Sequence, residues 1–422
     1  MTLRKTKILT ATIAALLACS PAYAAPALNY NRVIAKSQRL FKKSGYKVVA
    51  KTGTITKNLS SGKSFSVTKS SSKKRMYVSF FLLSLLSDML KKNRGERMDI
   101  ANIFYEAAVG DALGVPYEFR TREQMKERPC TDMRGGGSHL MPKGVWSDDT
   151  AMLLATADGM YKGISQIKKN YMKWLFLGCY APFHLVYDVG VTTRQAILRM
   201  PFKKLPGIDR ENANGNGSLM RILPMAIYLL DEDDIKKRRK AIYEVSALTH
   251  AHKVSCEGCF LYCEMARLLL KGKSKEKAYL ESCDSAINAY KRYSSGKILL
   301  LKEDDISSSG YVVDTLEAAV WCLLTSDSYE ETVLKAVNLG KDTDTVACVA
   351  GGLAGIIYPV PERWKRQLKK RKLLERIAEK ISVKDSFMRE ATHEEQESVE
   401  RYVESISKNT GIRFFDDEKK NQ

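Results

Sequence analysis

The stretch from Val346 to Tyr358 constrains the fold most strongly, because it is apolar on every face and ends just before Pro359. A helix without a polar face must be enclosed by other elements, and its many small residues indicate close neighbours. We therefore expect a buried helix with Asp342 and Asp344 at its N-terminus. Acidic side chains there complement the helix dipole, so helix capping alone is one interpretation.

A second acidic helix start weakens the capping interpretation. Ser147, Asp148, Asp149 and Thr150 precede another apolar run at 151–157. Carboxylates and hydroxyls are hard oxygen ligands, and two such helix ends facing each other would enclose one or two Mg²⁺ or Mn²⁺ ions. Four carboxylates brought together repel one another without a cation, so the sequence predicts a metal site.

The N-terminus has the features of a secretory signal peptide. Residues 1–7 are basic, residues 8–18 form a short apolar run, and a small-x-small site ends at Ala24. The run is too short for a transmembrane anchor in the mature protein. We expect export to the periplasm or the medium after cleavage of residues 1–24. A lipoprotein site at Cys19 is the alternative.

Residues 25–97 form a basic extension, with 17 Lys and Arg against 2 acidic residues, and they hold most of the net charge of +21. The Ser, Thr, Gly and Lys content from Lys51 to Arg75 indicates a flexible or weakly structured segment. It is either a solvated linker or an arm for anionic surfaces such as a membrane or nucleic acid. Residues 78–90 have the pattern of a short amphipathic helix.

From Met98 the apolar spacing is helical almost to the end of the chain, without strand-like alternation. We predict one all-α domain over 98–387 and a helical tail over 388–422, although this length could hold two domains. Cys256, Cys259 and Cys263 fall on one helical stripe. A packed apolar face explains this spacing better than a zinc site does.

Three loops carry further candidates. Glu118 follows a proline and is either a proton-transfer carboxylate or an ordinary surface residue. Gly135 to Gly137 form either a phosphate cradle or a plain flexible loop. The Asn and Gly residues of 214–217 precede a helix and predict an anion site, with Arg221 one turn further on.

Six motifs, in this order, resemble the ADP-ribosylglycohydrolase family over roughly residues 98–385. The motifs are G-D-A-L-G-x-P-x-E at 110–118, W-S-D-D-T at 146–150, D-x-G-x-T-T at 188–193, N-G-N-G-x-x-M-R at 214–221, T-H-x-H at 249–252 and D-T-D-T-x-x-x-x-A-G-x-x-A-G at 342–355. Each motif alone is weak, whereas six in the family's order are specific.

The resemblance implies a single compact orthogonal helical domain that binds two Mg²⁺, or Mn²⁺, and removes ADP-ribose from a protein or a related conjugate. The implied metal ligands are Ser147, Asp148, Asp149, Asp342, Asp344 and Thr345. The implied catalytic residues are Glu118 and Asp149. The implied substrate contacts are Gly136, Gly137, Asp188, Gly215, Asn216, Gly217, Ser218 and His250. Two residues depart from the family pattern, since Ser147 replaces Thr and Lys341 replaces Gly.

The predicted function is metal-dependent removal of ADP-ribose from a modified side chain, with arginine as the expected acceptor. The predicted partner is thus an ADP-ribosylated protein or an ADP-ribose conjugate, with no specific nucleic acid and no transmembrane anchor. One alternative is a catalytically silent ADP-ribose-binding or structural family member. Another is a phosphatase with Asp342 as nucleophile, which needs a β-strand before Asp342, where the sequence predicts a helix.

Overall fold

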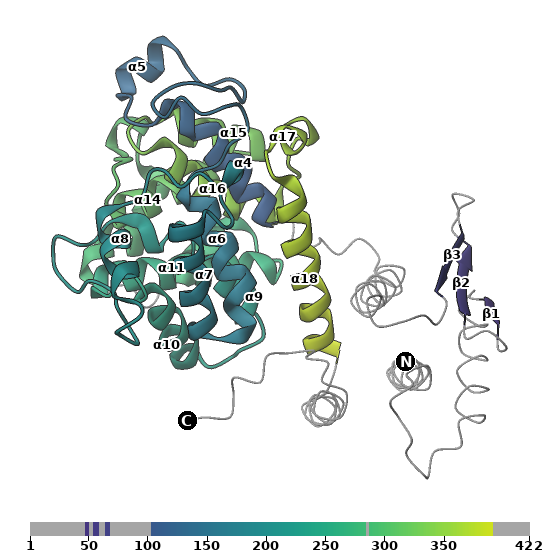
Figure 1. Cartoon of the computed structure of the whole chain (residues 1–422). Helices are drawn as coiled ribbons and strands as arrows, with labels where there is room; N and C mark the ends of the chain where they lie inside the picture. The colour runs from purple at the N-terminus through teal and green to yellow at the C-terminus, as the bar shows by residue number, and fades with distance from the viewer. Residues whose placement is uncertain (1–46, 50–53, 59–63, 68–102, 284–286, 391–422) are drawn as a thin grey trace. The chain divides into compact units, whose positions relative to one another are not determined.

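The computed structural model describes backbone for residues 47–49, 54–58, 64–67, 103–283 and 287–390, and side chains for 103–283 and 287–381. These residues belong to two units of the chain, a group of strands and a helical domain (Figure 1). The predicted signal peptide, the alternative lipoprotein site, the predicted helix at 78–90 and the tail beyond residue 390 lie outside the described residues.

The strands form an antiparallel three-stranded sheet in the order β1-β2-β3. They are β1 (Lys47–Val49), β2 (Thr54–Asn58) and β3 (Ser64–Val67). Lys47 pairs with Thr56, and Ile55 pairs with Val67. Most of this sheet falls within the segment from Lys51 to Arg75, where the sequence predicted no strands. The alternation of polar residues with β-branched or aromatic ones in this sheet is the period-two pattern of a strand.

The domain is helical, as predicted. Its α-helices are α4 (Ile103–Gly114), α5 (Arg122–Glu127), α6 (Asp148–Gly159), α7 (Ile164–Leu177), α8 (Val191–Arg199), α9 (Pro224–Tyr228), α10 (Ile235–Ser246), α11 (Lys253–Leu270), α12 (Lys275–Ser282), α13 (Lys291–Ser294), α14 (Val312–Leu324), α15 (Tyr329–Asn338), α16 (Thr343–Ile357), α17 (Glu362–Gln367) and α18 (Arg371–Glu390). Its 3₁₀ turns are η3 (Val115–Tyr117), η4 (Met160–Lys162), η5 (Pro182–His184), η6 (Asn216–Ser218), η8 (Asn288–Tyr290), η9 (Lys297–Leu300) and η10 (Glu303–Asp305). In the described part of the domain, β-structure is limited to isolated bridges.

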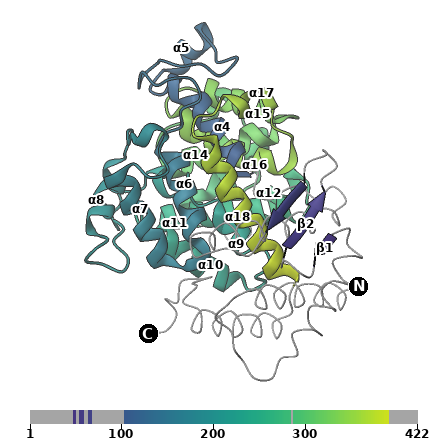
Figure 2. The ribbon, with the colours of Figure 1, turned by 45° about the vertical axis from the view of Figure 1, so that its right-hand side comes forward.

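Helices α4 and α16 lie at the centre of the domain in both views (Figures 1 and 2). Every residue of α4 is buried, and so is every residue of α16 except Ile357. This confirms the prediction that the apolar run after Asp344 is an enclosed helix. Its neighbours include α4, α14 and α15.

Helix α18 packs against α4 and α6 and runs along the outside of the domain (Figures 1 and 2). Over residues 371–381, buried and exposed positions recur with helical spacing, so one face of this part of α18 contacts the domain and the other contacts solvent. In the part of the chain that the structure describes, no helix has the length and apolar character needed to cross a membrane.

Candidate active site

A close contact between α4 and α16 fixes the position of Asp344. A Cβ atom at Gly114 would lie 2.3 Å from the Cα atom of Asp344, so only glycine allows this approach. The Thr343 hydroxyl also donates a hydrogen bond of 2.8 Å to the Gly114 carbonyl. The start of α16 is therefore held against the end of α4 by a close main-chain contact and by a side-chain hydrogen bond.

Asp111 on α4 supports the start of α6. Its carboxylate accepts hydrogen bonds from the backbone N–H groups of Ser147, at 2.9 Å, and Thr150, at 3.0 Å, and from the Thr150 hydroxyl, at 2.5 Å. These N–H groups belong to the helix terminus, where they lack partners within the helix. Asp111 thus caps α6 from another helix and positions Asp148 and Asp149.

The first turns of α6 and α16 meet, as predicted. One carboxylate oxygen each from Asp111, Asp149 and Asp344 lies within 4.8 Å of the other two. The Thr345 hydroxyl donates to Asp149 Oδ1 at 3.3 Å, which links the two helix ends directly. Ser147 Oγ accepts from the Asp149 N–H at 3.3 Å, so the capping interpretation is correct for this serine.

Asp342 is at the N-cap position of α16, but its side chain makes no capping hydrogen bond. Instead, its Oδ2 atom accepts a 2.8 Å hydrogen bond from Asn216 Nδ2. Oxygens of Glu118, Asp342 and Asp344 also lie within 4.8 Å of one another. Capping therefore does not explain Asp342. We call Asp111, Asp148, Asp149, Asp342 and Asp344 the acidic centre.

Burial and mutual repulsion disfavour ionisation throughout the acidic centre. Burial, followed by the neighbouring carboxylates, raises the pKa of Asp148, Asp149 and Asp344 well above the ordinary value. Burial raises the pKa of Asp111 only to about 6, because hydrogen bonds from Thr150 and Ser147 oppose it.

Three buried oxygens of the acidic centre have no hydrogen-bond partner, namely both oxygens of Asp344 and Oδ2 of Asp149. Buried polar atoms in folded proteins nearly always have partners. A divalent cation with a preference for oxygen ligands would satisfy these atoms and offset the repulsion. The residues present therefore fit a hard metal ion.

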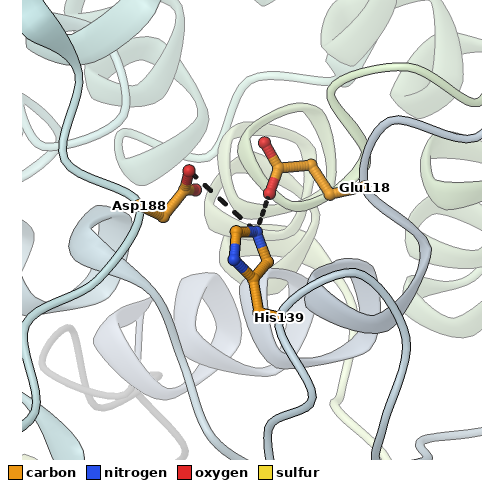
Figure 3. Close-up of side chains that lie close together, drawn as sticks. All are labelled: Glu118, His139 and Asp188. Carbon is orange, nitrogen blue, oxygen red and sulfur yellow. Dashed lines mark hydrogen bonds and ion pairs between the residues drawn. The ribbon is translucent and has the colours of Figure 1, made fainter.

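Glu118, His139 and Asp188 form a second group beside the acidic centre (Figure 3). His139 Nε2 contacts Glu118 Oε2 directly and lies 4.0 Å from Asp188 Oδ1. Glu118 is only 6% exposed, so the interpretation as an ordinary surface glutamate is wrong. Burial, followed by the charges of Asp188 and Asp342, raises the pKa of Glu118 to about 9.

The 214–218 loop lies against His250. A Cβ atom at Gly217 would lie 2.9 Å from His250 Cε1, and the nearest His250 atom to one at Gly215 is Nε2, at 3.7 Å. Burial lowers the pKa of His250 to about 3, so this imidazole is neutral. The Ser218 hydroxyl is buried and bonded to Ser246 Oγ at 3.0 Å, which leaves the Ser218 main chain for the predicted ligand contact.

Arg221 does not belong to the predicted anion site. It is fully buried, and its guanidinium donates to Tyr171 Oη at 2.5 Å and Thr249 Oγ1 at 2.6 Å. Through these contacts Arg221 links α7 to the end of α10 inside the core. The sequence expectation was wrong because the position of Arg221 after the loop does not determine which side of the chain its side chain faces.

Gly136 and Gly137 lie in a tight hairpin over residues 136–141, which we call the Gly hairpin. The Gly136 N–H donates to the Met141 carbonyl at 2.7 Å, and the Leu140 N–H donates to the Gly137 carbonyl at 3.2 Å. Both glycines have positive φ. The hairpin is an ordered turn, so the interpretation as a plain flexible loop is wrong.

Two residues of the site were missed at the sequence level. Asp111 could have been found, because a carboxylate within a largely apolar helix needs a buried partner. His139 gave no local signal, since only the hairpin brings it to Glu118.

Lys341, which replaces the glycine of the family pattern, has φ +61, a conformation that glycine adopts freely. Its side chain is exposed.

The structure also tests two alternatives. Cys256, Cys259 and Cys263 are free and buried in α11, which confirms the packed apolar face. Helix α15 precedes Asp342, where the phosphatase motif would need a strand. The phosphatase alternative therefore lacks its structural context.

Comparisons with known proteins agree with this architecture. A family profile described as ADP-ribosylglycohydrolase matches residues 103–394. The chain is 29% identical over 312 residues to the ADP-ribosylarginine hydrolase Tri1 of Serratia proteamaculans (strain 568), covering 70% of this chain and 80% of that protein. It is 32% identical over 287 residues to the ADP-ribosylarginine hydrolase Tri1 of Pseudomonas putida (strain GB-1), covering 65% and 75%.

A third relative is the ADP-ribosyl-dinitrogen reductase glycohydrolase of Rhodospirillum rubrum, which is 29% identical over 276 residues and covers 63% of this chain and 88% of that protein. A solved structure described as an ADP-ribosylglycohydrolase-related protein complex matches with a TM-score of 0.57 and 29% identity, covering 68% of this chain and 96% of that chain. The fold and these relatives define a glycohydrolase enzyme. The chain belongs to the ADP-ribosylglycohydrolase family, whose profile matches more than half of its 422 residues.

Proposed function

We propose that this enzyme is a metal-dependent hydrolase that releases ADP-ribose from a modified arginine of a substrate protein. The observation that carries the metal dependence is the pair of Asp344 oxygens, both buried and both without a hydrogen-bond partner. The arginine linkage rests on the two relatives described as ADP-ribosylarginine hydrolases.

The metal ligands in this proposal come from the two helix ends. They are Ser147, Asp148, Asp149, Asp342, Asp344 and Thr345, and they would hold two Mg²⁺ or Mn²⁺ ions. The bound ions would supply Lewis-acid stabilisation of oxygen atoms at the reacting ribose. Asp111 remains outside this ligand set, because its oxygens accept from the N-terminus of α6.

Glu118 is the proton-transfer residue in this proposal. Breaking a glycosidic bond requires a proton for the leaving group and removal of a proton from the incoming water. A carboxyl group that is buried, with a pKa raised to about 9, retains a proton at neutral pH in the metal-free protein. Nearby cations would lower that pKa towards the neutral range that suits proton transfer in both directions.

The loop at 215–218 would bind the diphosphate of ADP-ribose through its main chain. The loop combines small residues with a helical turn, η6. The Asn216 N–H at the start of η6 donates to the Gly310 carbonyl at 3.0 Å, so the proposal assigns the diphosphate contacts to the N–H groups of Gly217 and Ser218. Neutral His250 can line this pocket without a charge of its own. Asn216 joins the loop to the acidic centre through its bond to Asp342.

Release of ADP-ribose from defined substrates tests the proposal. Wild-type enzyme with Mg²⁺ or Mn²⁺ should release ADP-ribose from Arg-linked substrate faster than from Ser-linked substrate, and EDTA should stop the reaction. Glu118→Gln should lower kcat by about 100-fold or more, the scale of lost proton transfer, with nearly unchanged ADP-ribose affinity. Glu123→Gln, at an exposed glutamate of α5, is the matched control.

The same assay distinguishes the alternatives. Binding of ADP-ribose without release from any acceptor would support the silent family member instead. Hydrolysis of simple phosphomonoesters, abolished in Asp342→Asn, would support the phosphatase. Faster release from Ser-linked substrate would retain the hydrolase but reject the arginine linkage.

A further inference from the structure

We infer that His139 is the positioning residue of Glu118. This inference rests on the proposed function, in which Glu118 transfers the proton. Figure 3 shows one Glu118 oxygen against the His139 ring and the other pointing away from it. A Glu118 oxygen also lies within 4.8 Å of oxygens of Asp342 and Asp344. The histidine thus fixes one oxygen and leaves the other for the reaction.

The Gly hairpin brings His139 to this place. Gly137 has φ +74, and a Cβ atom there would lie 1.9 Å from the Pro116 carbonyl oxygen. Only glycine lets the hairpin lie directly on Pro116, two residues before Glu118. The Ser138 hydroxyl donates to the Glu118 carbonyl. Main-chain contact, Ser138 and His139 therefore hold both the backbone and the side chain of Glu118.

The His139 ring has little freedom to turn. Its centroid lies 5.8 Å from the Phe119 ring and 5.2 Å from the Tyr187 ring. Asp188 Oδ1 lies 4.0 Å from the same Nε2 atom that contacts Glu118. The side chain is 16% exposed. Aromatic neighbours and a second carboxylate keep Nε2 directed at Glu118, because turning the ring would remove both polar contacts.

Imidazole suits a carboxyl group that changes its protonation state during a reaction. With the hydrogen on Nε2, histidine donates to the Glu118 carboxylate. With the hydrogen on Nδ1, it accepts from the Glu118 carboxylic acid. The contact can therefore persist in both states. Lysine or arginine could only donate, and an apolar side chain could do neither.

Steady-state kinetics on four variants test the inference. His139→Phe keeps an aromatic ring between Phe119 and Tyr187 but removes the nitrogen. We expect kcat to fall about 10- to 100-fold, the range for losing a hydrogen bond to a charged group, with KM within about 3-fold. His139→Gln restores a donor and an acceptor and should recover most of kcat. Combined with Glu118→Gln, His139→Phe should cost less than about 2-fold more. His184→Phe, at an exposed histidine in η5, should have no effect.

Additive losses in the Glu118→Gln background would overturn the inference, and so would a change in KM alone. A second measurement does not depend on turnover. Side-chain ¹⁵N spectra of histidine-labelled protein should show the His139 signals shifting in Glu118→Gln while those of His184 stay in place. If wild type releases no ADP-ribose, the proposed function fails and the spectra decide the His139 contact alone. Unchanged His139 signals would reject it in either case.

Discussion

Replacing Asp344 by Asn should stabilise the metal-free enzyme while removing most of its response to magnesium. Asp344 is 1% exposed, and neither of its oxygens has a hydrogen-bond partner. Burial and the charges of Glu118 and Asp149 raise its pKa. An Asn amide is uncharged and can donate to these neighbours. The substitution therefore relieves repulsion in the metal-free state.

The expected magnitudes follow from burial and mass action. Asn avoids the free-energy cost of burying this carboxyl group, which arises either from a buried charge or from proton uptake on folding. The substitution should therefore add about 1–3 kcal/mol to the free energy of unfolding of metal-free protein at pH 8. For wild type, a magnesium concentration of 100 times the dissociation constant should add about 2.7 kcal/mol. For a domain of this size, that gain corresponds to roughly 4–5 °C in Tm. The Tm of Asp344→Asn should rise with magnesium by less than about half of the wild-type gain.

Calorimetric unfolding of one protein preparation, measured once in EDTA and once in magnesium, gives both the metal-free stability and the gain from magnesium. Asp304→Asn is the control, because Asp304 is 81% exposed and forms a surface ion pair with Lys126. It should change neither the metal-free Tm nor the magnesium response. A metal-free Asp344→Asn protein less stable than wild type, or an equal magnesium response in both proteins, would refute the reasoning.

Two further predictions concern pH and packing. The pKa of Glu118 rises on folding from 4.5 to about 9, so the folded protein holds this proton more tightly than the unfolded chain does. The resulting contribution to the free energy of unfolding is complete below pH 4.5. It is lost between pH 4.5 and pH 9, by about 1.4 kcal/mol per pH unit. Tm of metal-free protein should therefore fall from pH 6 to pH 9, and magnesium should reduce this slope; a metal-free Tm that rises with pH would contradict it. Gly114→Ala should cost several kcal/mol in urea unfolding and weaken magnesium binding, because its Cβ would lie 2.3 Å from Asp344 Cα. Gly190→Ala, where the nearest atom would be 3.8 Å away, should do neither, and equal losses in both variants would count against the packing argument.

The sequence predicted the helical domain and the meeting of the two acidic helix starts, because both depend on local patterns. An apolar run without a polar face must be enclosed, and paired carboxylates at two such helices need a common partner. Asp342 was found at one of these helix starts, whereas the catalytic role of Glu118 was implied by the family resemblance. The sequence could not show that Asn216 bonds Asp342, because that contact joins residues far apart in the chain.

The remaining features depend on tertiary contacts or on conformations without a local signature. Arg221 follows an anion-binding pattern, yet it faces the core, since its partners Tyr171 on α7 and Val245 on α10 come from other parts of the chain. His139 becomes part of the site only through the Gly hairpin. The strands β2 and β3 were overlooked because the Ser, Thr, Gly and Lys content of the segment outweighed its short alternating pattern.

The main-chain contact between α4 and α16 has a consequence for how this enzyme can diverge. A mutation cannot move Asp344 on its own, because its Cα rests against Gly114 and any shift would be passed to the helix that carries Asp111. The end of α4 and the start of α16 can thus shift only together. Substitutions in these two helices should therefore be accepted only where they leave both helix axes in place. Loops such as the Gly hairpin are under no such restriction. New acceptor preferences should therefore arise by replacement of loop residues around an unaltered pair of helices.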